Sequence, residues 1–253
     1  MKLRALVLLA LSTVFPAFAQ QAFVERWKAR VAAFRVENET LAQGSRRVVL
    51  LGSSSMEGWL QRDRVARFLP TVGPRVLNRG ISGDGIGITV PGPSGLRNRL
   101  EASAVDCQPS HVFVLNGRNS LGYGVERTAE AYRALLTELR ERLPGVVVCV
   151  ITCAPVNHGY ADKREAVEQL NARLRAIAKE TGCWLIDLHP KLVGPDGLMK
   201  RELTKDGLHF KDEGYRLLGV AIERVVRESE AQAPPPQQTQ PKQGGLSGSL
   251  EQD

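Results

Sequence analysis

Five short apolar segments constrain the fold of this chain more than any other feature of its sequence. Each is nearly continuous in apolar residues and rich in β-branched side chains, and together they comprise residues 48–51, 76–77, 111–115, 146–151 and 184–188. Continuous apolar runs of this length are typical of strands that are covered on both faces, as in parallel sheets. The sequence therefore predicts a parallel sheet of five strands.

Segments with helical periodicity lie before, between and after these strands. Apolar residues recur at helical spacing in residues 22–42, 132–143, 167–177 and 217–226. Strands that alternate with helices build a sandwich with helices on both faces of the sheet. We therefore expect a three-layer α/β/α fold, in which ligands bind beyond the carboxyl ends of the strands.

The first residues have the organisation of a signal peptide. Lys2 and Arg4 precede an apolar run over residues 5–15, and the triplet Ala17-Phe18-Ala19 follows. We expect cleavage after Ala19 and export to the periplasm or the medium. An uncleaved membrane anchor is the alternative, although the apolar run is short for a membrane span. No later apolar segment approaches the length of a transmembrane helix, so no stable membrane insertion is expected after cleavage of residues 1–19.

The rest of the chain is predicted to form one domain, residues 20–230, which includes the N-terminal helix 22–42. The composition, 43% hydrophobic and 24% charged, is typical of a globular protein with a single core. Residues 231–253 are rich in Pro, Gln, Gly and Ser and have no apolar periodicity. Such a segment buries too little apolar surface to order itself, and we expect a disordered tail.

The distribution of charge argues against a nucleic acid as partner. The formal net charge is +7, and removal of Lys2 and Arg4 with the leader lowers it to +5. The basic residues are spread along the chain, and no nucleic-acid-binding motif accompanies them.

No cofactor or metal ion is indicated by the sequence. The glycines around Gly83 do not form the GxGxxG pattern of a dinucleotide site. His111, His158 and His189 show no paired metal-ligand spacing. We expect structural or surface roles for all three, and a place in a substrate cleft is the alternative for His158 together with Tyr160.

Four cysteines allow either disulfides or buried free thiols. Cys107, Cys149, Cys153 and Cys183 are an even number in a chain expected in an oxidising compartment, which permits three complete pairings. Cys149 and Cys153 would lie about 13 Å apart on one extended strand, too far for a direct bridge. The sequence alone leaves open whether the cysteines form disulfides or remain free thiols.

Polar clusters follow the predicted strands and precede the last helix. They read GSSSMEGW from Gly52, NRGISGD from Asn78, NGRNS from Asn116 and DGLHF from Asp206. Because the carboxyl ends of parallel strands meet at one edge, we expect these clusters to converge there.

The residue types in these clusters suit nucleophilic catalysis. A serine needs a base within hydrogen-bond reach, and that base needs a group that orients it. Ser54 fits the nucleophile, His209 the base and Asp206 the orienting group. The backbone N–H groups of Ser54 and Gly83 and the side-chain amide of Asn119 fit the donors of an oxyanion hole. A simple role in satisfying loop backbone is the alternative for Asn119.

These clusters resemble the four ordered blocks of the GDSL or SGNH hydrolases. GSSSMEGW is similar to the first block, NRGISGDG to the second, GRNS to the third and DGLHF to the last, over residues 22–228. The helix before the GSSS block is similar to one branch of the family. The resemblance implies a flavodoxin-like SGNH fold, catalysis by Ser54, His209 and Asp206, an oxyanion hole of Ser54, Gly83 and Asn119, and no cofactor.

Two positions depart from the family pattern. Ser53 and Ser120 stand where the family usually has Asp, which puts the local loop structure in question. Ser53 and Ser55 also compete with Ser54 for the role of nucleophile, and only the register of the block favours Ser54.

We therefore expect a serine esterase that removes acyl groups such as acetyl from a carbohydrate or small-molecule ester. The alternatives are a catalytically inactive protein that binds envelope glycans on the same fold, and a nucleotide or flavin module. Thioesters, phospholipids and peptidoglycan stay open as substrates. We expect the substrate cleft to be shaped by loops around Met56, Trp59, residues 86–93 and residues 156–161.

Overall fold

Five strands form one parallel sheet in the computed structural model, which describes residues 2–87 and 94–232 of the chain. The strands are β1 (Arg47–Gly52), β2 (Val76–Gly80), β3 (Pro109–Leu115), β4 (Val147–Ile151) and β5 (Trp184–Ile186). They are ordered β2-β1-β3-β4-β5, and every pairing is parallel. The predicted parallel sheet is confirmed.

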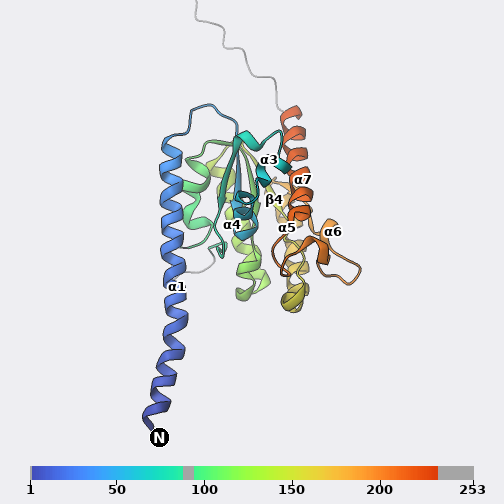
Figure 1. Cartoon of the computed structure of the whole chain (residues 1–253). Coiled ribbons are helices and arrows are strands. Elements are labelled where there is room, and N and C mark those ends of the chain that lie inside the picture. Colours follow the sequence, from blue (N-terminus) through green and yellow to red (C-terminus); the bar gives the residue numbers. More distant parts are fainter. Residues whose placement is uncertain (1, 88–93, 233–253) are drawn as a thin grey trace, which may run out of the picture.

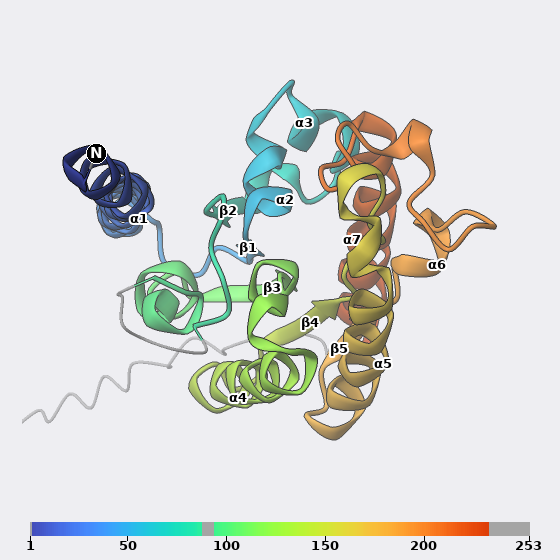
Figure 2. The ribbon, with the colours of Figure 1, turned by 90° about the horizontal axis from the view of Figure 1, so that it is seen from below.

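Helices cover both faces of this sheet. The longer ones are α1 (Lys2–Glu39), α4 (Val125–Arg142), α5 (Arg164–Glu180) and α7 (Asp212–Gln232), and the short ones are α2 (Ser54–Glu57), α3 (Arg64–Phe68) and α6 (His189–Leu192). One core cluster joins α4 and α5 to the sheet, and a second joins α7 and α2 to its other face. Figure 2 shows α4 and α3 on opposite sides of the strands. The three-layer α/β/α sandwich is confirmed.

The order of the strands creates a switch point beside β1. The chain passes from β1 to β2 on one side, and then returns across β1 to β3 on the other. Loops that leave β1 and β3 therefore diverge, and in sheets of this kind they leave a crevice at the carboxyl ends of the strands. The segments that follow these two strands begin near Ser54 and Asn119.

Helix α1 packs at the edge of the sandwich. Trp27, Val31 and Phe34 are buried against Ile81 and Ala102 in a small cluster of their own. The predicted helix over residues 22–42 is part of a longer one, which begins at Lys2 and ends at Glu39. Alanine and leucine, both strong helix formers, are frequent in the leader and extend the helix backwards. Figure 1 shows this first part extending away from the sheet.

Within the described residues, none of the helices combines the length and apolarity that crossing a membrane requires. The predicted tail falls almost wholly on residues 233–253, outside the part of the chain that the structure describes.

All four cysteines are free. Cys149 belongs to the core cluster on the α7 face of the sheet, whereas Cys107 and Cys153 belong to the cluster on the α4 face. The sheet therefore separates Cys149 from the other two. Burial raises the pKa of the Cys153 thiol to about 11, so it stays protonated at neutral pH.

Candidate active site

Ser54 lies at the junction of β1 and α2. The strand ends at Gly52, and the carbonyl oxygen of Ser53 accepts hydrogen bonds from the backbone N–H groups of Met56 and Glu57, at 3.0 and 2.9 Å. These bonds start the short helix and turn the Ser54 side chain towards the rim of the sheet. A Cβ atom on Gly80, at the end of β2, would lie 2.1 Å from the backbone nitrogen of Glu57. Only glycine allows α2 to approach β2 this closely.

The three neighbouring serines have different surroundings. Ser53 and Ser55 are buried, whereas Ser54 is half-buried. The Ser55 hydroxyl accepts a hydrogen bond from Arg118. The Ser54 hydroxyl lies 3.0 Å from Nε2 of His209, so of the three it is Ser54 that contacts the predicted base.

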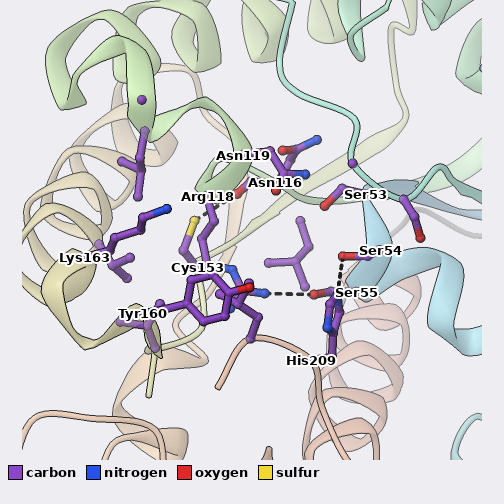
Figure 3. Close-up of a pocket in the computed structure, with 18 of the residues that line it drawn as sticks. Ser53, Ser54, Ser55, Asn116, Arg118, Asn119, Cys153, Tyr160, Lys163 and His209 are labelled. Carbon is purple, nitrogen blue, oxygen red and sulfur yellow. Dashed lines mark hydrogen bonds between the residues drawn. The ribbon is translucent and has the colours of Figure 1, made fainter. Parts of the chain in front are cut away.

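Asp206 and His209 occupy a tight loop just before α7. Nδ1 of His209 lies 2.7 Å from Oδ2 of Asp206, while Oδ1 of Asp206 accepts the backbone N–H groups of Leu208 and His209. The hydroxyl of Thr204 closes the loop, because it accepts from the Gly207 N–H and donates to the His209 carbonyl. Figure 3 shows His209 and Ser54 joined by their hydrogen bond. The loop thus presents the imidazole in one orientation.

The charge on Asp206 determines the state of the imidazole. Partial burial raises the pKa of Asp206. Hydrogen bonds from the His209 ring and from the backbone N–H groups of His209 and Leu208 lower it by more, and the net effect is a pKa of about 2. A carboxylate can only accept, so Nδ1 of His209 carries a proton and donates a hydrogen bond to Asp206. Nε2 is then free to accept the Ser54 proton.

The loop after β2 carries Gly83 with a φ of +84°. Its turn is closed by a hydrogen bond from the Asp84 N–H to the Ile81 carbonyl, at 3.1 Å. Arg26 of α1 donates to the Ser82 carbonyl at 2.7 Å. The loop is therefore held by its own turn and by the N-terminal helix.

Asn119 approaches this loop from the end of β3. Its amide donates a hydrogen bond of 2.9 Å to the Asp84 carbonyl, which is the loop-bracing role given above as the alternative. A side-chain amide has two N–H donors, and one of them remains for a ligand. Asn119 is exposed and lines the same cavity as Ser54, Gly83 and His209. The structure thus brings together every residue that the sequence marked for catalysis.

Two cavities meet at Ser54 and His209. One, of about 700 Å³, extends past Asn119 towards Val156 and Tyr160. The other, of about 660 Å³, extends past Asp206 towards α3 and α7. Both include Ser54, Ser82 and His209, so a bound ester can place one part in each cavity while its carbonyl faces Ser54.

The loops expected to shape the cleft do so only in part. Val156 and Tyr160 line one cavity, and the segment around Met56 and Trp59 reaches the other through Glu57 and Gly58. Met56 and Trp59 are 0% and 1% exposed and pack in the core beneath α2, because they lie on the inner face of the turn that follows Ser54. Ile86 is also buried, and residues 88–93 lie outside the described part of the chain. His158 does not line the cavity that contains Tyr160.

The chain matches the family model described as GDSL-like lipase/acylhydrolase over residues 50–217. The chain belongs to this family. It is therefore a hydrolase that acts on esters, as the four sequence blocks predicted. A search of curated proteins finds no match.

Solved structures of other ester hydrolases share the fold of this GDSL family member. A GDSL-like lipase from Bacteroides thetaiotaomicron is 22% identical, with a TM-score of 0.66 over 79% of this chain and 98% of that one. A lipase/acylhydrolase from Enterococcus faecalis is 24% identical, with a TM-score of 0.56 over 73% and 96%. An acetylxylan esterase from Geobacillus stearothermophilus is 20% identical, with a TM-score of 0.54 over 72% and 93%.

The two serines that depart from the GDSL family pattern occupy buried loop positions. The Ser120 hydroxyl accepts a hydrogen bond of 3.1 Å from the Ile86 N–H, which links the loop after β3 to the loop after β2. Ser53 caps the start of α2 through its carbonyl oxygen. Both positions therefore have local partners without a carboxylate.

Sequence reasoning missed a buried arginine that supports this GDSL-type site. Arg99 is fully buried and pairs with Asp84 at 2.7 Å, while donating to the carbonyl oxygens of Gly52 and Arg79 at the ends of β1 and β2. Burial raises the pKa of Asp84 above its usual value, although the guanidinium of Arg99 opposes this rise. The signal in the sequence is weak, because an arginine near apolar residues usually extends its charge to water.

Among the described residues no group of three or more His, Cys, Asp or Glu side chains could hold a metal ion. His111 is buried between the hydroxyls of Ser110 and Ser229, at 2.8 and 2.9 Å. Its role is structural, as expected.

Proposed function

We propose that this protein is a serine esterase that removes acyl groups such as acetyl from a carbohydrate or small-molecule ester. The hydrogen-bonded chain from Ser54 through His209 to Asp206 carries the proposal, with distances of 3.0 and 2.7 Å. This is the arrangement that nucleophilic acyl transfer requires: a hydroxyl, a base in contact with it, and a carboxylate that orients the base.

Each group has a defined task in the proposed reaction. Ser54 Oγ attacks the ester carbonyl as its proton passes to Nε2 of His209, and Asp206 stabilises the imidazolium that forms. The backbone N–H groups of Ser54 and Gly83 and the Asn119 amide donate to the oxyanion. His209 then protonates the leaving alcohol, which leaves an acyl group on Ser54.

The second half of the reaction reverses these roles. A water molecule enters the space that the alcohol has left and gives its proton to His209 as it attacks the acyl carbonyl. The new tetrahedral intermediate uses the same donors. Its collapse releases the carboxylic acid and returns the proton to Ser54.

The choice of substrate has support from the cavities and from the comparisons. The cavity beside Asn119 combines apolar side chains with hydrogen-bonding groups. A protein of the same fold is named an acetylxylan esterase, which makes acetylated carbohydrates the first substrates to test, ahead of thioesters and phospholipids.

A fluorophosphonate probe tests the proposal, since it reacts only with an activated serine. We expect wild type to be labelled on Ser54 and to hydrolyse p-nitrophenyl acetate, and Ser54→Ala to do neither. Ser53→Ala is the matched control, because its hydroxyl is one residue away and has no contact with His209 among the described interactions. It should keep the label.

Other outcomes would contradict the proposal. Labelling of Ser53 or Ser55 would show that the labelled serine, and not Ser54, is the nucleophile. An unlabelled wild type that binds acetylated glycans without hydrolysing them would favour the inactive binding protein instead.

We also propose that the protein is exported, with residues 1–19 removed and residues 20–230 forming the mature domain. The sequence of the leader supports this, and so does the extension of the start of α1 away from the sheet. Expression of the whole chain in a bacterial host, followed by N-terminal sequencing of the periplasmic protein, should give Gln20 as the first residue. A product that begins at Met1 would contradict export by cleavage.

A further inference from the structure

The two cavities at Ser54 differ in charge. The larger one is lined by three cationic side chains, Arg26, Arg118 and Lys163, and by no Asp or Glu. The other is lined by four carboxylates and four cations. A cleft with charges of one sign and partly apolar walls attracts ligands of the opposite sign. The cavity beside Asn119 therefore favours an anion.

The half-buried Arg118 has fewer side-chain hydrogen bonds than the buried arginines of the described structure. Arg64, Arg79 and Arg99 each pair with a carboxylate, and Arg47 donates to two backbone carbonyl oxygens. Arg118 has no carboxylate partner among the described residues, and the hydrogen bond found for its side chain runs from Nη2 to the Ser55 hydroxyl, at 3.2 Å. Its Nη1 atom is buried without any partner in that part of the chain.

A guanidinium that is partly buried without a carboxylate partner lowers the stability of the ligand-free protein. The group has five N–H donors and stays protonated at physiological pH. Burial lowers the pKa of Arg118 from its usual value, which reflects the loss of hydration of the charge. A bound anion would restore both the missing hydrogen bonds and the charge balance.

The position of Arg118 relates it directly to the reacting groups. It precedes Asn119 in the chain, and its partner Ser55 follows Ser54. Figure 3 shows Arg118 and Lys163 extending from different segments towards the same space. Lys163 lies at the end of a 3₁₀ turn, His158–Lys163, with its amine 5.6 Å from the centre of the Tyr160 ring. A single substrate molecule could therefore place its anionic group at Arg118 and its ester group at Ser54.

We propose that this cavity is a subsite for a carboxylate carried by the ester substrate, with Arg118 as its main ligand and Lys163 as a second cation. A planar carboxylate matches the paired N–H groups of a guanidinium. The inference rests on the proposed esterase function and narrows it to acidic esters. The carboxylate can belong to the acyl group, as in a half-ester of a dicarboxylic acid, or to the alcohol, as in an acylated acidic sugar.

Matched pairs of charged and neutral esters test the subsite. On the acyl side the pair is the mono-p-nitrophenyl ester of adipic acid and its methyl ester. On the alcohol side it is m-acetoxybenzoate and its methyl ester. The measured quantity is the ratio of kcat/KM for the charged ester to kcat/KM for the neutral one, so a general loss of activity cancels.

We expect wild type to prefer the charged member of one pair by about tenfold, the size of a charge-assisted hydrogen bond in a partly buried site. The pair that shows the preference identifies the side of the ester that carries the carboxylate. Arg118→Gln should bring that ratio close to one, and Lys163→Gln should lower it by a smaller factor. Arg133→Gln is the control, because Arg133 is an exposed residue of α4 that pairs with Glu180. It should keep the wild-type ratio.

A binding measurement separates the subsite from catalysis. Titration of Ser54→Ala with the mono-p-nitrophenyl ester of adipic acid and with m-acetoxybenzoate by calorimetry requires no hydrolysis. At least one should bind more tightly than its methyl ester, and the difference should vanish in the double variant with Arg118→Gln.

The outcomes are distinguishable. Equal ratios for both pairs in wild type, or a preference that survives Arg118→Gln, would overturn the subsite and leave the esterase proposal intact. Tight binding of a charged ester without hydrolysis by wild type would overturn the esterase proposal and leave the anion site. Absence of both would overturn both.

Discussion

The indole N–H of Trp27 donates a hydrogen bond of 3.1 Å to the fully buried carboxylate of Asp84. Trp27 belongs to α1, and Asp84 follows Gly83 in the loop that offers a donor to the proposed oxyanion. The N-terminal helix therefore does more than cover the edge of the sheet. It helps to set the position of the loop around Gly83, which lies more than fifty residues further along the chain.

Trp27→Phe should lower kcat about tenfold and leave KM nearly unchanged. The variant keeps an aromatic ring in the core but removes a donor to a buried charge, which costs about 1.5–3 kcal/mol of stability. A small displacement of Gly83 then weakens the transition state more than substrate binding. Steady-state kinetics with p-nitrophenyl acetate measure both constants.

Val31→Ala is the control for this variant. Val31 is buried in the same cluster as Trp27 and has no polar side-chain atom to bond the loop. Its truncation should destabilise the fold by about 2 kcal/mol and leave kcat of the folded protein unchanged. Equal losses of kcat in both variants would show that stability alone is responsible.

Asp206→Asn should lower kcat by about 10²–10⁴-fold. The amide keeps the size of the side chain, but it cannot stabilise an imidazolium or hold a single tautomer of His209. Asp162→Asn, which changes an exposed carboxylate of the neighbouring 3₁₀ turn, should have no such effect. A loss of less than threefold in Asp206→Asn would remove Asp206 from the mechanism.

Asn119→Asp should be more damaging than Asn119→Ala. Alanine removes one oxyanion donor, which costs about 10²–10³-fold in kcat. Aspartate removes the donor and adds a negative charge where the oxyanion forms, so its loss should be larger. Asn98→Asp, at an exposed position, controls for the added charge. If both Asn119 variants keep wild-type kcat, the loop-bracing hydrogen bond to Asp84 is the whole role of Asn119.

His111 should make the protein sensitive to mild acid. Burial lowers the pKa of His111 from 6.5 to about 4. The unfolded chain therefore takes up a proton at a higher pH than the folded one, so this contribution to stability is present above pH 6.5 and is lost as the pH falls to about 4. A shift of this size corresponds to about 3 kcal/mol.

Urea unfolding at a series of pH values checks this prediction. Wild type should lose stability between pH 6.5 and 4, and His111→Gln should lose about 3 kcal/mol less over the same interval. His158→Gln, at an exposed histidine, should follow wild type. If the two variants have the same pH dependence as wild type, His111 titrates normally in the fold.

The parts of this structure that depend on local pattern were predictable. Strands covered on both faces need continuous apolar runs, so the segments around Val49 and Val112 identified the sheet, and its parallel order placed Ser54 and His209 at one edge. The chemistry of those residues followed from their types. Their catalytic roles stay predictions until the variants are measured.

The parts that depend on packing between distant segments were not predictable. Met56 and Trp59 follow the serine and looked available to a substrate, yet the turn of α2 directs both into the core. Arg118 and Arg99 look alike as isolated letters in the sequence. Only the fold shows that one has a carboxylate within reach and that the other is without one among the described residues.

Ser54 and His209 are separated by 155 positions, yet their side chains touch. A chain that is still emerging from the ribosome or from an export channel carries its hydroxyl long before its imidazole exists in folded form. The proposed hydrolysis therefore requires a chain that extends at least to His209. We expect any product that stops before His209 to be inactive, so that turnover reports on chains in which both ends of the domain are present and folded together.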